Sequence, residues 1–114
     1  MKKIEAYVKP HKLSDVVMAL QKVKEFSGMS VTDVRGFGRR GPTPSTPRTR
    51  IDDLIDFSPY AKVEIFCGDE AAEEIVGVIT HSARTGLRGD GKIYVSSVEK
   101  VVRIINGVKG EQAI

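Results

Sequence analysis

The stretch IEAYVKPHKLSDVVMALQKVKEF, residues 4–26, contains two hydrophobic periods in succession. Residues 4–9 alternate apolar and polar side chains, as a half-buried strand does, and a proline ends that alternation. From Leu13 to Phe26 the apolar side chains recur every three or four positions, which is typical of one helix face. Ser14 is a candidate N-cap for that helix. The stretch therefore predicts a strand followed by a helix.

The same order of periods occurs again between residues 61 and 83. Residues 61–67, AKVEIFC, alternate as a strand does, and Asp69 is a candidate N-cap for a second helix. The apolar face predicted for this helix consists of Ala72, Ile75, Val76, Ile79 and Ala83.

Two shorter strand-like runs, Val31–Val34 and Ile93–Ser96, complete the order βαββαβ. That order predicts an α+β fold in which both helices cover one face of an antiparallel sheet. The opposite face would carry aromatic side chains, which favours burial against sister subunits. Residues 98–105 fit a short strand or an extended tail, and both alternatives stay open.

The composition predicts a single small domain that stays in the cytoplasm. The chain has 114 residues, of which 40% are hydrophobic, and no apolar run approaches the roughly 20 residues that cross a bilayer. The net charge of +3 fits an anionic ligand and fits a solvated basic surface equally well. Cys67 is the only cysteine and reads as a buried hydrophobe. His11 and His81 make no metal-ligand spacing with it, so no metal is predicted.

Two basic glycine segments indicate where an anion could bind. The segment TGLRGDGK, residues 85–92, leads into a strand, and its glycines let backbone N–H groups approach a ligand closely. A second segment, RGFGRR at residues 35–40, follows another strand. Either segment alone reads equally well as a plain connector. Together they suit a polyphosphate.

These two segments, with the start MKKIEA, the run GMSVT at residues 28–32 and the ending GEQAI, resemble the PII signal-transduction family over nearly the whole chain. The resemblance implies a homotrimer of ferredoxin-like subunits that binds an adenine nucleotide in clefts between subunits. ATP, ADP and an AMP-type nucleotide are the candidate effectors. The resemblance implies a regulator and not an enzyme.

The resemblance also implies one domain, residues 1–114, in which a long loop at about residues 38–58 contacts a regulated partner protein. This loop is rich in proline, serine and threonine, a composition that favours extended, solvated chain. A membrane transporter is one candidate partner, and neither nucleic acid nor membrane insertion is expected. The loop contains no tyrosine, so uridylylation of the familiar kind is excluded. Modification at Ser45, Thr46 or Thr49 is left open.

In the family, the segment that corresponds to residues 85–92 and the base of the long loop bind the phosphates. Two residues on the strand floor lie near the adenine, and a neighbouring subunit contributes an arginine. Taken one at a time, these residues read as ordinary surface or core positions. The residues that the resemblance assigns to the nucleotide site are Ser30, Gly36, Gly38, Arg39, Arg40, Glu64, Phe66, Gly89, Asp90, Gly91, Lys92 and Arg103.

Three departures from the family pattern indicate a divergent, PII-like member. Arg40 stands where the family has a glutamine that helps to hold magnesium and 2-oxoglutarate, and Tyr60 replaces the lysine that pairs with 2-oxoglutarate. We therefore expect the 2-oxoglutarate site to be lost. Ile105 replaces an arginine, which favours weaker ATP binding or a preference for ADP, AMP or a cyclic nucleotide.

Two other function classes fit parts of the sequence less well. The run Arg35–Gly38 is similar to the start of the RNA-recognition signature on the same βαββαβ topology, but arginines follow where base stacking needs an aromatic side chain. A small phosphotransferase would need an activated His11 or His81, and neither has an orienting partner nearby in sequence.

Overall fold

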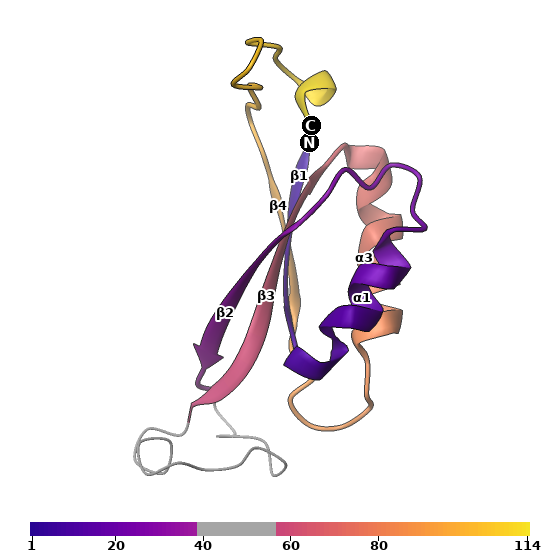
Figure 1. Ribbon diagram of the computed structural model, residues 1–114, viewed down its shortest axis with the longest axis vertical. Coiled ribbons are helices and arrows are strands. Elements are labelled where there is room, and N and C mark those ends of the chain that lie inside the picture. Colours follow the sequence, from indigo (N-terminus) through magenta and orange to yellow (C-terminus); the bar gives the residue numbers. More distant parts are fainter. Residues whose placement is uncertain (39–56) are drawn as a thin grey trace.

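Two helices lie on one face of a four-stranded antiparallel sheet in the computed structural model, which describes residues 1–38 and 57–114 (Figure 1). The sheet order is β2-β3-β1-β4, so β1 and β3 are central while β2 and β4 form the edges. This arrangement confirms the predicted α+β fold with βαββαβ order. The elements are β1 (Lys2–Val8), η1 (Pro10–Lys12), α1 (Leu13–Leu20), β2 (Ser30–Gly36), β3 (Ser58–Cys67), α3 (Asp69–Ala83), β4 (Ile93–Ser97) and η2 (Glu111–Ala113).

The core lies between the sheet and the helices, and the strand alternation explains which residues enter it. Every second residue of β1 and β3 points toward α1 and α3, because successive side chains in a strand point to opposite faces. Cys67 is among these buried side chains, as predicted. The fully buried large side chains are Ile4, Leu20, Ile65, Ile75, Ile79, Val8, Val16, Val63 and Cys67.

The first helix is shorter than its hydrophobic period predicts. α1 ends at Leu20, and its N-cap position is Lys12 without a side-chain cap bond, so the prediction of Ser14 as the cap was wrong. Beyond the helix, the amides of Val23 and Phe26 each bond to the carbonyl oxygen three residues earlier. These tight turns keep apolar side chains at intervals of three, and Val23 is still buried.

The second helix runs over the predicted residues with one difference at its start. Gly68 occupies the N-cap position of α3, and Asp69 is the first helical residue, so the prediction of Asp69 as the cap was wrong. The Asp69 carboxylate instead accepts a hydrogen bond of 2.7 Å from the amino group of Met1. That bond, together with the charge of the amino group, lowers the pKa of Asp69.

The segment after β4 is neither a strand nor a simple tail. Val102 and Lys109 form an isolated antiparallel bridge, and the Arg103 amide bonds to the Val108 carbonyl at 2.8 Å. The turn between them exposes Ile104 fully and Ile105 almost fully. Residues 98–114 thus form a short hairpin followed by η2, beyond the end of the sheet (Figure 1).

Candidate functional site

The sheet face opposite the helices carries alternating charges along its two central strands. Lys3 lies 3.1 Å from Glu5 on β1, Lys62 lies 3.2 Å from Glu64 on β3, and Lys3 reaches Glu64 at 4.0 Å. The Lys3 ammonium, followed by the Tyr7 hydroxyl, lowers the pKa of Glu5 through hydrogen bonds. This face therefore presents lysine–glutamate ion pairs at its centre.

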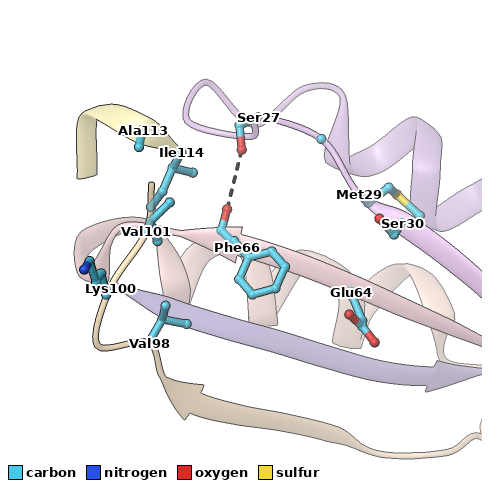
Figure 2. Close-up of a pocket in the computed structure, with 11 residues that line it drawn as sticks. Ser27, Met29, Ser30, Glu64, Phe66, Val98, Lys100, Val101, Ala113 and Ile114 are labelled. Carbon is cyan, nitrogen blue, oxygen red and sulfur yellow. Dashed lines mark hydrogen bonds between the residues drawn. The ribbon is translucent and has the colours of Figure 1, made fainter. Parts of the chain in front are cut away.

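A cavity of about 530 Å³ lies at the end of this face where β2 begins and β3 ends (Figure 2). Three predicted site residues line it: Ser30 from β2, and Glu64 and Phe66 from β3. Ser30 and Glu64 are directly paired across the two strands, and Phe66 is 43% exposed and lines the cavity. The remaining lining residues are Ser27, Gly28, Met29, Val98, Lys100, Val101, Ala113 and Ile114.

The chemistry of this cavity suits a flat heteroaromatic group with polar edges. The Phe66 ring and the neighbouring valine and methionine side chains offer apolar contact, while the Ser30 hydroxyl can both donate and accept a hydrogen bond. Glu64 adds acceptor oxygens. The structure thus brings Glu64 and Phe66, the strand-floor residues predicted near the adenine, together with Ser30, a further predicted site residue.

The segment 85–92 is held in shape by hydrogen bonds to one carboxylate. Asp90 accepts hydrogen bonds from the amides of Thr85 (3.0 Å) and Gly86 (2.9 Å), and from the Thr85 hydroxyl. The Lys9 ammonium lies 3.4 Å from the same carboxylate. Partial burial raises the pKa of Asp90, but these hydrogen bonds outweigh it and lower the pKa to about 2.

The end of this segment lies tightly against the central strand β1. Gly91 has a φ of +89°, and a Cβ atom built on it would lie 1.8 Å from the Tyr7 carbonyl oxygen. The Tyr7 amide also bonds to the Lys92 carbonyl at 3.0 Å. Only glycine therefore fits at this position, and the backbone of Lys92 is fixed at the start of β4.

The two glycine segments lie at the same end of the sheet but at opposite edges. β2 ends at Gly36, and β4 begins just after Lys92; both points lie at the end where β1 finishes. Two strands separate these edges, which puts the segments at least roughly 14 Å apart across the sheet of one subunit. Gly38 lies just beyond β2, while Arg39 and Arg40 fall outside the described residues.

Arg103 lies at the other end of the molecule, in the C-terminal hairpin. Its guanidinium donates a hydrogen bond of 3.1 Å to the Gln112 carbonyl. Within one subunit Arg103 is therefore not brought together with Gly89–Lys92. Ser58, the last residue of the predicted loop, is the first residue of β3 and is buried.

Sequence reasoning missed two residues that organise the glycine segment. Lys9 read as the polar end of a strand, yet it is only 9% exposed and its ammonium donates to the Thr85 hydroxyl at 3.1 Å. Thr85 lay inside the segment without a role. The two residues are 76 positions apart, and no local pattern connects them.

Comparisons with known proteins agree over the whole chain. The family model described as Nitrogen regulatory protein P-II matches residues 1–108. Proteins named nitrogen regulatory protein P-II from Rhizobium meliloti (strain 1021) and Pasteurella multocida (strain Pm70) are each 46% identical over 114 residues, which is the full length of both chains in each pair. The protein of that name from Azospirillum brasilense is 44% identical over the same length.

No helix in the described ranges 1–38 and 57–114 has the length and apolar character needed to cross a bilayer. The fold, the arrangement of the glycine segments and these full-length matches agree with one another. The chain belongs to the nitrogen regulatory protein P-II family of signal-transduction regulators.

Proposed function

We propose that this protein is a non-enzymatic cytoplasmic regulator that binds an adenine nucleotide between the subunits of a homotrimer and controls a partner protein through residues 38–58. The observation that carries this proposal is the course of β2. This strand leads from the cavity at Ser30 to the glycines at Gly36 and Gly38, about 20 Å along the sheet edge. An extended nucleotide laid along this edge would have its base in the cavity and its phosphates at the glycines.

The separation of the two glycine segments supports binding between subunits. A single phosphate group cannot contact segments roughly 14 Å apart, so one subunit alone offers only half of the proposed phosphate site. A second subunit that places its segment 85–92 beside the β2 edge of the first would supply the other half of the phosphate site. Arg103 would likewise act from a neighbouring subunit, since its own chain holds it at the opposite end.

The open sheet face favours this reading over the RNA-binding alternative. RNA-recognition modules with this topology stack bases on aromatic side chains of the sheet, next to cations that neutralise phosphate. Here Lys3 is paired with Glu5 and Lys62 with Glu64, so the cations of that face are already neutralised by carboxylates and are not left to bind a phosphate backbone.

Arg39→Ala and Lys92→Ala should each weaken nucleotide binding by about 1.5–3 kcal/mol, which is the range for hydrogen bonds to charged groups. Calorimetric titration with ATP, ADP and AMP measures this loss and identifies the preferred effector. Lys24→Ala removes one exposed positive charge just after α1 and serves as the control. If neither variant differs from the control, the two segments do not share a ligand and the proposed site is wrong.

Light scattering should give about three times the chain mass of 12.5 kDa. The physical reason is the apolar surface that one subunit leaves open: Tyr94 and Phe66 are 53% and 43% exposed on the sheet face, and Ile104 is fully exposed in the C-terminal hairpin. Burial of this surface would favour association. A stable particle of 12.5 kDa would contradict the trimer and, with it, a site built between subunits.

The proposed contact with the partner protein lies in residues 38–58. Residues 39–56 fall outside the described residues, so the contact surface itself rests on the family resemblance. A membrane transporter is one candidate, and a pull-down from membranes in the presence and absence of the preferred nucleotide would test it. Binding that does not depend on the nucleotide would contradict a regulatory role for the site.

A further inference from the structure

Lys9 is a buried cation that is not among the proposed nucleotide-binding residues. It follows directly after β1, and only 11% of its side chain is exposed. Lysine is rarely buried unless it is paired. Its ammonium lies 3.1 Å from the Thr85 hydroxyl and 3.4 Å from the Asp90 carboxylate, so it joins the end of β1 to the glycine segment.

The hydrogen bonds around this ammonium form a closed network. One oxygen of Asp90 accepts a hydrogen bond from the Thr85 hydroxyl and lies beside the Lys9 ammonium. The other oxygen accepts hydrogen bonds from the amides of Thr85 and Gly86. The Thr85 hydroxyl also accepts the amide of Leu87 at 3.1 Å. Both oxygens of Asp90 therefore already have partners within this network.

The charge of this network matters for an anionic ligand. An ionised carboxylate inside a phosphate-binding segment repels the ligand unless a cation or N–H groups neutralise it. Lys9 supplies that cation from a rigid strand end, on the side of Asp90 that the backbone amides do not cover. The Lys9 ammonium can therefore neutralise Asp90 without contacting the ligand.

We propose that Lys9 is a positioning residue for nucleotide binding, which holds segment 85–92 in its binding shape and neutralises Asp90 without contacting the nucleotide. This inference rests on the proposed function and adds a residue to it. It assigns Asp90 the same indirect role, in place of a direct contact with the ligand. Of the predicted site residues in this segment, Gly89, Gly91 and Lys92 are then left to contact the ligand directly.

The matched pair Lys9→Met and Lys12→Met tests the proposal. Both variants remove one lysine charge near the end of β1, but Lys12 pairs with Asp15 of α1 at 2.8 Å, away from the segment. In the nucleotide-free protein, Lys9→Met should speed amide hydrogen exchange at Thr85 and Gly86 by about tenfold or more, as expected when a charged hydrogen-bond partner is lost. It should also raise the pKa of Asp90 from about 2, measured by carboxyl NMR titration. Lys12→Met should change neither.

Calorimetry with ATP then separates an indirect role from a direct contact. Lys9→Met should weaken binding about tenfold or more, and this loss should largely disappear when it is measured in an Asp90→Asn background. An equal loss in both backgrounds would mean that Lys9 contacts the phosphates itself and would overturn the proposal. If the wild-type protein binds no adenine nucleotide, the proposed function is wrong. Independently of that result, the proposed network is wrong if Lys9→Met leaves both the amide exchange rates of Thr85 and Gly86 and the pKa of Asp90 unchanged.

Discussion

Gly91→Ala is expected to destabilise the protein by about 3–5 kcal/mol, or to prevent folding altogether. Two costs add at this position. A side chain at a φ of +89° is strained by about 1–3 kcal/mol, and its Cβ atom would lie 1.8 Å from the Tyr7 carbonyl oxygen. That oxygen belongs to the central strand β1, where Tyr7 is paired with Lys62 of β3 and its amide bonds to the Lys92 carbonyl, so it cannot move without disturbing these bonds. Urea unfolding followed by circular dichroism measures the loss.

Gly86→Ala is the matched control for this variant. Gly86 has a φ of +79°, similar to that of Gly91, but a Cβ atom built on it meets nothing within 4 Å. It should therefore cost only the strain of the left-handed conformation, about 1–2 kcal/mol. Equal losses in the two variants would show that the contact with β1 gives way easily, and that the glycine segment is less firmly attached than the structure indicates.

We expect no detectable 2-oxoglutarate binding at micromolar concentrations, with or without ATP and magnesium. The family resemblance places a magnesium-holding glutamine and a cationic lysine in that site, and this chain has Arg40 and Tyr60 instead. Tyr60 lies on β3 with its ring 3.0 Å from a Cβ atom built on Gly36, so a neutral ring covers the strand end. Loss of both groups should reduce affinity by two or more orders of magnitude.

The double variant Arg40→Gln with Tyr60→Lys provides the reverse test, because it restores both residue types of the family pattern. Calorimetric titration in the presence of ATP and magnesium should then detect binding that the unaltered protein lacks. A saturable, ATP-dependent titration of the unaltered protein would contradict the expectation. In that case Arg40 grips a carboxylate directly, and the protein senses 2-oxoglutarate by other residues.

The fold could be predicted from the sequence wherever one hydrophobic period extends over a whole helix or strand. β1 buries alternate residues from Ile4 to Val8, β3 buries alternate residues from Ala61 to Cys67, and α3 buries most of its predicted face, so their periods are clear. The pattern failed at residues 21–26, because turns with bonds three residues apart place Val23 and Phe26 at nearly the same spacing as a helix would. It also failed at the hairpin of residues 98–114, which one bridge and a few backbone bonds define.

The site was predictable only where residues close in sequence act together or where the family pattern supplied them. Ser30, Glu64 and Phe66 do meet at one cavity, because the register of β2 against β3 aligns them. The role of Lys9 could not be predicted from the sequence, because its pairing with Thr85 and Asp90 depends on the end of β1 lying beside a segment far along the chain. Arg39 and Arg40 remain predictions that the described residues do not test.

The central place of β1 in the sheet also has a consequence for how the chain is made. β1 lies at residues 2–8, but its two neighbours, β3 and β4, are complete only at residues 67 and 97. A nascent chain therefore carries its innermost strand with both edges open during synthesis of more than half of the protein. Such long-range pairing slows folding, and a translation pause before residue 97 would leave one edge of β1 open to intermolecular pairing.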